Sequence, residues 1–195
     1  MRSTLHDMAN ILGGLKGILD LTAPEQPISE RDRRRLEAVL EEGITTLERC
    51  RHLTLQTLPE GPLEPGPEWR EQLLEELAPL GTLFRCRFEL DVAGSPGWDR
   101  WPGGLLRSYV RAVTRQVLPY ARGGTLCLRC EADADGWRLR WSPAPALPES
   151  LSACADGPQL DICSRWAFQV GSALGATLAW EAGAVHSHVP RQRIQ

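Results

Sequence analysis

A proline-rich run, PEGPLEPGP at residues 59–67, divides the sequence into two parts with different patterns. Four prolines within nine residues exclude a helix or a central strand there, because proline fixes φ and lacks the backbone N–H. The run is therefore predicted to be a stiff linker between two domains. Helical periodicity precedes it, and alternating helix-like and strand-like segments follow it, so an α+β fold is predicted.

The first domain, residues 1–58, is predicted to be a hairpin of two helices. If Leu5 is heptad position a, every a, d and g position from 5 to 19 holds a large apolar side chain, which makes a wide apolar stripe. These residues are Leu5, Met8, Ile11, Leu12, Leu15, Ile18 and Leu19. A turn containing Pro24 and Pro27 follows. The second helix is expected from Ser29, which has capping-box spacing to Asp32, to about Leu58. Its apolar or small seam positions are Leu36, Leu40, Gly43, Leu47, Cys50, Thr54 and Leu58.

One hairpin cannot cover so wide a stripe by itself. Two subunits would cover it by forming a four-helix bundle about a two-fold axis, and a homodimer is predicted on this ground. The alternative is that the C-terminal domain covers the stripe within one chain.

The second domain, residues 68–195, is predicted to be an α/β sandwich with a mixed sheet and helices on one face. Helices are expected at residues 68–81, 105–121 and 159–175, and strands at residues 84–92, 125–133, 137–143, 176–183 and 184–190.

Composition excludes several classes of protein. A net charge of −3 gives no reason to expect nucleic acid or a membrane surface as a partner. No apolar run approaches the ~20 residues that span a bilayer, and a signal peptide is not recognised, so a cytoplasmic protein is expected. Of the six cysteines, only Cys127 and Cys130 have metal-like spacing, and no second pair accompanies them. They are interpreted as packing residues, and no metal site is predicted.

A candidate reactive residue lies near the start of the first helix. His6 falls at position b, away from the apolar stripe, so its imidazole is predicted to project into solvent. A neutral imidazole nitrogen can attack phosphorus and hold the phosphoryl group. Asp7 is placed to orient the ring or accept a proton, and Asn10 follows one turn later.

Three glycines in the same helix support this hypothesis. Gly13 and Gly17 continue the stripe of His6, and Gly14 flanks it. Each glycine in a helix costs about 0.8–1 kcal/mol relative to alanine, so we expect another surface to approach the helix closely there.

Simpler interpretations remain open. His6 is then an ordinary surface residue, Asp7 is the acidic half of a capping box with Thr4, and the glycines serve helix–helix packing. The histidines at 186 and 188 are interpreted as neighbours on one face of a strand rather than as metal ligands.

The stretch LHDMANILGGLKGILDL, Leu5 to Leu21, followed by a turn and a second long helix, resembles the dimerisation and histidine-phosphotransfer hairpin of bacterial sensor histidine kinases. His6, Asp7 and Asn10 match the phosphoacceptor motif of that family position for position. The resemblance implies that His6 is the phosphoacceptor and that Asp7 is its acid/base neighbour.

The second domain resembles the ATP-binding domain of the same family in element order but not in its nucleotide motifs. Arg111 and Arg115 stand where the family has two Mg-coordinating asparagines, and Ser142 stands where it has the adenine-reading aspartate. Arginine has no acceptor atom and cannot coordinate Mg²⁺. ATP is therefore not expected to bind, and the ATPase domain is interpreted as degenerate.

A histidine hairpin on a degenerate ATPase domain resembles the dimeric histidine phosphotransferases of two-component phosphorelays. The resemblance implies exchange of a phosphoryl group between His6 and the aspartate of a response-regulator receiver domain, with Mg²⁺ supplied by the receiver and no ATP-dependent kinase activity. Receivers are then expected to dock against Gly13, Gly14 and Gly17. Two other functions remain open: a non-catalytic dimeric binding or inhibitor protein for a receiver or histidine kinase, and an active kinase with an unusual nucleotide site.

Overall fold

The computed structural model describes residues 13–14, 16–17, 28–55, 58, 69–93, 103–132, 135–147 and 162–191. Residues 13–14 and 16–17 are helical and belong to the expected first helix. The remaining elements, in chain order, are α2 (Glu30–Leu55), α3 (Trp69–Phe84), β1 (Arg87–Ala93), α4 (Gly103–Val117), the 3₁₀ helix η3 (Leu118–Ala121), β2 (Thr125–Ala132), β3 (Gly136–Ala144), α5 (Ile162–Ala173), β4 (Thr177–Glu181) and β5 (Ala184–Pro190).

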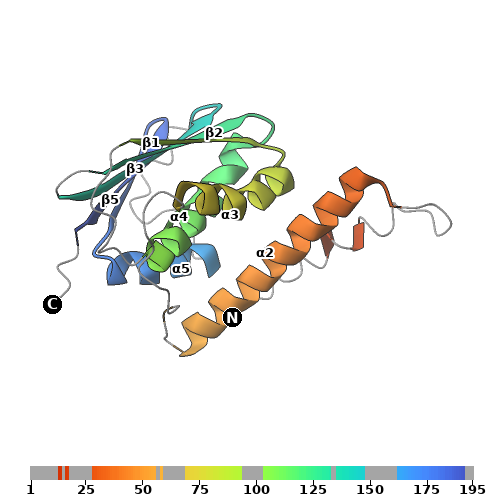
Figure 1. Cartoon of the computed structure of the whole chain (residues 1–195), viewed down its shortest axis with the longest axis horizontal. Helices are drawn as coiled ribbons and strands as arrows, with labels where there is room; N and C mark the ends of the chain where they lie inside the picture. The colour runs from red at the N-terminus through yellow and green to blue at the C-terminus, as the bar shows by residue number, and fades with distance from the viewer. Residues whose placement is uncertain are drawn as a thin grey trace.

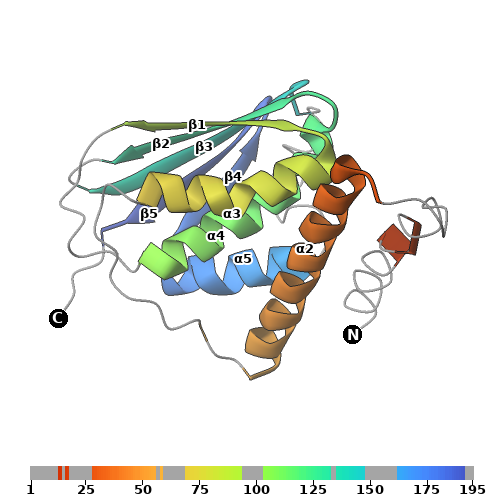
Figure 2. The ribbon, with the colours of Figure 1, turned by 45° about the vertical axis from the view of Figure 1, so that its right-hand side comes forward.

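The strands form one mixed sheet in the order β1-β2-β3-β5-β4. β1 pairs with β2 in parallel, with α4 as the crossover between them, and the other three neighbouring pairs are antiparallel. Helices α3, α4 and α5 cover one face of the sheet and leave the other face open (Figures 1 and 2). The predicted mixed sheet with helices on one face is therefore confirmed.

Tryptophans anchor the core between the sheet and its helices. Trp69 of α3 and Trp137 of β3 are buried, and their ring centroids lie 5.3 Å apart. The indole Nε1–H of Trp141 donates to Thr114 Oγ1 of α4 at 2.8 Å, which satisfies two buried polar groups at once. These contacts fix α3 and α4 on the inner face of the sheet.

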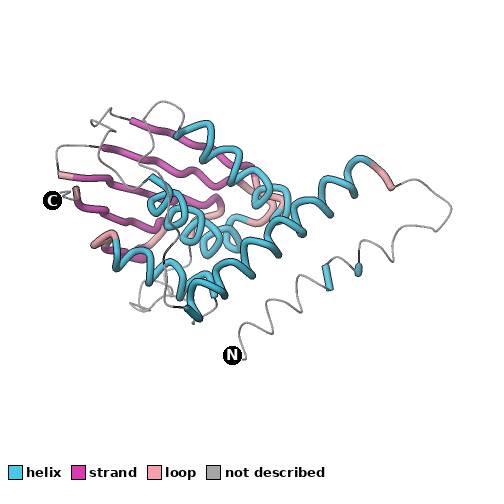
Figure 3. Tube along the Cα trace, turned by 60° about the horizontal axis from the view of Figure 1, so that its bottom comes forward, coloured by secondary structure: helices cyan, strands magenta, loops and turns pink. Residues whose placement is uncertain are grey.

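Helix α2 starts at the predicted cap and lies across the three helices of the α/β domain. The Ser29 hydroxyl accepts from the backbone N–H of Asp32 at 3.1 Å and donates to the Asp32 carboxylate at 2.6 Å. The helix then packs against α3 and α5 (Figures 2 and 3). It is described as helical to Leu55, three residues before the expected end at Leu58.

The face that α2 buries is not the predicted apolar seam. Leu40 and Leu47 belong to that seam, yet each is 51% exposed, and Ile44 between them is 59% exposed. Besides Ala38 and Val39, the buried residues of α2 are polar, with Glu42 and Arg49 each only 3% exposed. Charged residues are rarely this buried without partners, so the buried side indicates a specific ion cluster.

Candidate functional site

Two regions carry the candidate site residues. His6, Asp7 and Asn10 lie outside the described residues, so their geometry stays a prediction. Gly13, Gly14 and Gly17 are described, helical and exposed.

The surroundings of the three glycines differ. A Cβ placed on Gly13 or Gly17 would meet no atom within 4 Å among the described residues, whereas a Cβ on Gly14 would lie 3.8 Å from Cγ1 of Val39 in α2. Gly14 therefore faces the second helix of the hairpin, and the other two face open space. Among the described residues, helix–helix packing therefore does not explain why residues 13 and 17 are glycines.

The second region is a buried ion cluster centred on Glu42 of α2. Arg115 Nε and Arg49 Nη1 lie 3.1 Å and 3.5 Å from Glu42 Oε1, and Arg111 Nη2 lies 3.4 Å from Oε2. The Glu42 side chain is only 4% exposed. One carboxylate thus accepts hydrogen bonds from Arg111 and Arg115 of α4 and forms an ion pair with Arg49 of α2.

Arg111 makes further contacts that hold its guanidinium in one place. It donates to Thr45 Oγ1 of α2 and to the backbone oxygen of Glu76 in α3, each at 3.1 Å. Glu41 Oε1, on a half-exposed side chain, lies 3.9 Å away. Arg111 therefore joins three helices through its two Nη atoms, whereas its buried Nε–H has no hydrogen-bond partner among the described residues.

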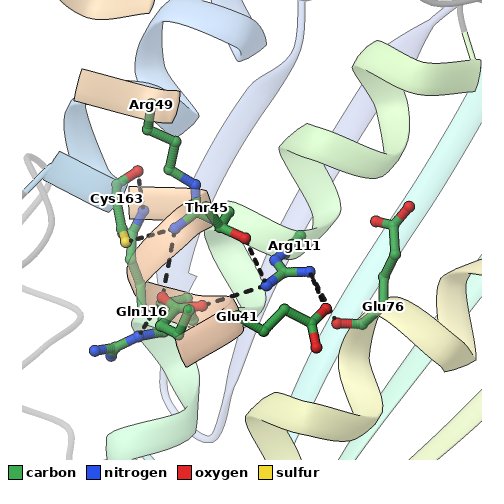
Figure 4. Close-up of polar contacts among 9 residues, drawn as sticks. Glu41, Thr45, Arg49, Glu76, Arg111, Gln116 and Cys163 are labelled. Atoms are coloured by element: carbon green, nitrogen blue, oxygen red, sulfur yellow. Dashed lines mark hydrogen bonds and ion pairs between the residues drawn. The ribbon is translucent and has the colours of Figure 1, made fainter. Parts of the chain in front are cut away.

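The cluster extends to α5 and to the end of α3. Arg49 Nη1 donates to Cys163 Sγ at 3.1 Å, and Gln116 Nε2 of α4 donates to the Cys163 backbone oxygen at 3.5 Å. The Arg115 guanidinium lies 4.5 Å from the centre of the Phe84 ring. Helices α2, α3, α4 and α5 thus meet around one set of buried charges (Figure 4).

This cluster determines what the two α4 positions can do chemically. Arg111 and Arg115, which the family resemblance would place at magnesium-binding positions, direct their guanidinium groups at a carboxylate of the helical hairpin. A divalent cation placed there would meet positive charge and no free oxygen ligand from either residue. The arrangement is suited to holding α2 against the α/β domain.

Ser142 lies apart from these arginines. The hydrogen bond from Trp141 to Thr114 shows that Trp141 faces the helices. Neighbouring side chains of a strand point to opposite faces, so Ser142 faces the open side of the sheet, opposite Cys127 of β2. The structure therefore does not bring Ser142 to Arg111 and Arg115.

The two cysteines of β2 also lie on opposite faces of the sheet. Cys130 is fully buried on the helix side, where burial raises the pKa of its thiol, whereas Cys127 lies on the open face. Two thiols on opposite faces of a strand cannot hold one ion between them. No cluster of three or more potential metal ligands occurs among the described residues.

Glu42 and Arg49 were not identified as site residues from the sequence. A Glu and an Arg seven residues apart lie on one helical face, and this spacing was the available signal. Their partners on α4 are more than sixty residues away in the chain, and periodicity does not indicate such pairing. None of the described helices is long and apolar enough to cross a bilayer.

No protein-family model matches the sequence, and no curated protein matches it. Solved structures do resemble it. The Acinetobacter baumannii histidine kinase AdeS matches with a TM-score of 0.55 and 16% identity over 96% of each chain. The blue-light activated histidine kinase EL346 of Erythrobacter litoralis matches with a TM-score of 0.52 and 16% identity, over 95% of this chain and 63% of that one.

Likeness at this level of identity shows the fold alone. The mixed five-stranded sheet, covered on one face by helices, agrees with the ATPase-type α/β sandwich expected from the sequence. The chain therefore has a histidine-kinase-like α+β fold, with an α/β domain of the ATPase type.

Proposed function

We propose that this chain is a histidine-containing phosphotransferase of a bacterial two-component phosphorelay, which exchanges a phosphoryl group between His6 and the aspartate of a receiver domain. The histidine-kinase-like fold supports a place in two-component signalling. The motif His6-Asp7-Asn10 supplies the acceptor.

One structural observation carries the proposal of transfer without kinase activity. The Glu42 carboxylate is bound by Arg111 and Arg115, at the two positions where an ATP-dependent kinase of this fold needs metal ligands. These side chains serve the contact with α2, which supports an α/β domain that acts as a scaffold. ATP is not expected as a cofactor, and Mg²⁺ is expected from the receiver.

The proposed reaction is an in-line displacement at phosphorus. A neutral imidazole nitrogen of His6 attacks the phosphorus of the receiver's aspartyl phosphate, the new N–P bond forms, and the P–O bond to the aspartate breaks. The aspartate leaves as a carboxylate, and the other imidazole nitrogen releases its proton, with Asp7 as the nearby acceptor. The reverse sequence returns the phosphoryl group to a second receiver.

The glycines give the receiver a place to dock. Gly13 and Gly17 are exposed, and a side chain there would meet nothing among the described residues. A receiver helix lying against this bare surface would come close to the helix backbone. Replacing Gly13 or Gly17 with Leu or Glu is expected to reduce receiver binding and transfer, and undiminished transfer would show that receivers dock elsewhere.

A homodimer is part of the proposal. Leu40, Ile44 and Leu47 form an exposed apolar stripe on the side of α2 that the α/β domain leaves uncovered. Such a stripe at spacing 4-3 fits the seam of a four-helix bundle. A second copy of the hairpin would bury it.

The direct test is transfer of label from a phosphorylated receiver. Receivers from the same genome are phosphorylated with labelled acetyl phosphate, freed of donor and mixed with the protein. Acid-labile label is expected on the wild type and on a His52→Gln control, whose histidine lies on α2. It is expected to be lost in His6→Ala, and retention of label in that variant would reject His6 as the acceptor.

Two alternative functions have separate signatures. A non-catalytic dimeric binding or inhibitor protein would keep its effect on a receiver or histidine kinase after His6→Ala, and the exposed stripe of α2 is the observation that favours a binding protein. An active kinase would bind a fluorescent ATP analogue tightly and only with Mg²⁺. That result would overturn the role assigned to Arg111 and Arg115.

A further inference from the structure

The open face of the sheet carries an array of cationic and titratable side chains at its centre. Arg138 and Arg140 of β3 both point outward, as do His186 and His188 of β5. The register places Arg138 opposite His188 and Arg140 opposite His186. Neighbouring members are two residues apart along a strand or directly paired across strands, so the four side chains form a compact square.

A depression of about 390 Å³ lies over this square. The small side chains of Thr177 and Ala179 on β4 line it beside the histidines, whereas Arg138 and Arg140 line the other side. A depression of this size fits a small organic ligand or a phosphate group. It is built on adjacent strands of a hydrogen-bonded sheet, which position side chains more rigidly than loops do.

Carboxylates on the flanking strands oppose part of this square, and Arg140 is its least opposed member. Glu131 of β2 lies opposite Arg138 in the register. On β2, Arg129 is occupied by Glu131 at 2.8 Å and lies 3.6 Å from Asp91 of β1. On β4, Glu181 Oε2 lies 3.5 Å from His186 Nε2. No carboxylate of the described residues lies within ion-pair distance of Arg140, which is exposed.

We propose that this depression binds the phosphate group of a small phosphorylated molecule, through Arg140 and Arg138 with His188 and His186 beside them. A planar guanidinium matches two phosphate oxygens, and charge-assisted hydrogen bonds of this kind are strong. Two arginines disfavour a metal ion at the same place. The site lies on the sheet face opposite the ion cluster of Glu42 and does not depend on phosphoryl transfer by His6.

Glu181 competes with the ligand for His186, because its Oε2 lies 3.5 Å from His186 Nε2. Glu181→Gln is therefore expected to strengthen binding.

Isothermal titration calorimetry of the full chain tests the site, with inorganic phosphate and O-phosphoserine as probes. Saturable binding is expected, and Arg140→Gln is expected to weaken it about tenfold or more. Arg87→Gln is the matched control, because Arg87 lies on the same open face but at the far edge strand, 3.3 Å from Glu89. Tighter binding of O-phosphoserine than of phosphate would identify an organic phosphate as the ligand, and equal binding would identify free phosphate.

Sulfate is a further probe, because it is a tetrahedral dianion like phosphate. Its affinity is expected to be lower in a His186→Gln, His188→Gln double variant, which replaces both imidazoles that line the depression. Circular dichroism establishes that each variant is folded. The proposal is overturned if no probe binds saturably, if folded Arg140→Gln binds as tightly as Arg87→Gln, or if citrate binds as tightly as phosphate.

Discussion

Glu42 shows how a single residue can determine which face of a helix packs against the rest of the protein. Its carboxylate is nearly inaccessible to water and is paired with guanidinium groups of α2 and α4. Burying an ion pair gains little net free energy relative to an apolar contact, but removing one partner leaves the others charged and unpaired. The cluster therefore contributes more to the specificity of packing than to overall stability.

Glu42→Gln is expected to lower the free energy of unfolding by about 3–5 kcal/mol, because Arg49, Arg111 and Arg115 would lose their shared carboxylate. Urea denaturation followed by tryptophan fluorescence measures the change. Glu41→Gln is the control, since Glu41 is half-exposed and 3.9 Å from Arg111, and such a pair contributes about 0–1 kcal/mol. Equal effects of the two substitutions would contradict the central role of Glu42.

The first turn of α2 shows how charges stabilise an element. Arg33 donates two hydrogen bonds to the Glu30 carboxylate at 2.9 Å, and Arg34 donates one at 3.1 Å. These bonds lower the pKa of Glu30 from 4.5 to about 2. A carboxyl whose pKa is lowered on folding stabilises the fold above its unfolded-state pKa, and this contribution is lost as the pH falls through the folded-state value.

An NMR titration of the Glu30 side chain is therefore expected to give a midpoint near 2. In an Arg33→Gln, Arg34→Gln double variant the pKa is expected to return toward 4.5. Arg35→Gln is the control, because none of the described carboxylates lies within ion-pair distance of Arg35. A midpoint that is the same in all three proteins would show that the two arginines do not hold the carboxylate.

Two helical glycines are predicted to respond oppositely to alanine. In α5, a Cβ on Gly171 would lie 2.9 Å from Cε2 of the buried Tyr109, so Gly171→Ala forces α4 and α5 apart and costs about 1–3 kcal/mol. Gly17→Ala meets no described atom and should gain about 0.8–1 kcal/mol from helix propensity. Thermal unfolding compares the two, and a stabilised Gly171→Ala variant would contradict the close approach of the helices.

The sequence predicted individual helices and strands better than it predicted their packing. Alternation predicted β2 and β3, because this signal lies within a few residues. The start of α2 at Ser29 followed from cap chemistry that is equally local. The first strand was expected from Phe84, but α3 extends to that residue, since Arg85 makes the turn with a positive φ of 53°.

Sequence reasoning was less successful in placing these elements against one another. Hydropathy identified the stripe of Leu40 and Leu47, which is exposed, and missed the polar side of α2 that packs on α3 and α5. A buried polar side has no apolar periodicity to detect, and its partners Arg111 and Arg115 follow Glu42 by 69 and 73 residues. Ser142 was grouped with those arginines through the family resemblance of its segment alone, and that resemblance does not show on which face of the sheet a residue lies.

At the scale of the whole molecule, the exposed stripe predicts assembly. A Leu40→Ser, Leu47→Ser double variant is expected to sediment as a monomer in analytical ultracentrifugation, whereas the wild type is expected to sediment as a dimer. Leu178→Ser, which removes another partly exposed leucine from β4, is expected to remain dimeric. A monomeric wild type, or a dimeric double variant, would contradict assembly through α2.

The contact between α2 and the α/β domain also has a consequence for movement. An enzyme that delivers a phosphoryl group from its own nucleotide to a histidine on another element must let the two travel relative to each other. Here such a movement would separate Arg111 and Arg115 from Glu42 and leave buried charges unpaired. The cost in free energy would be several kcal/mol. The contact therefore holds α2 rigidly on the α/β domain. Under the proposed transfer function, the receiver has to make the movement that brings donor and acceptor together.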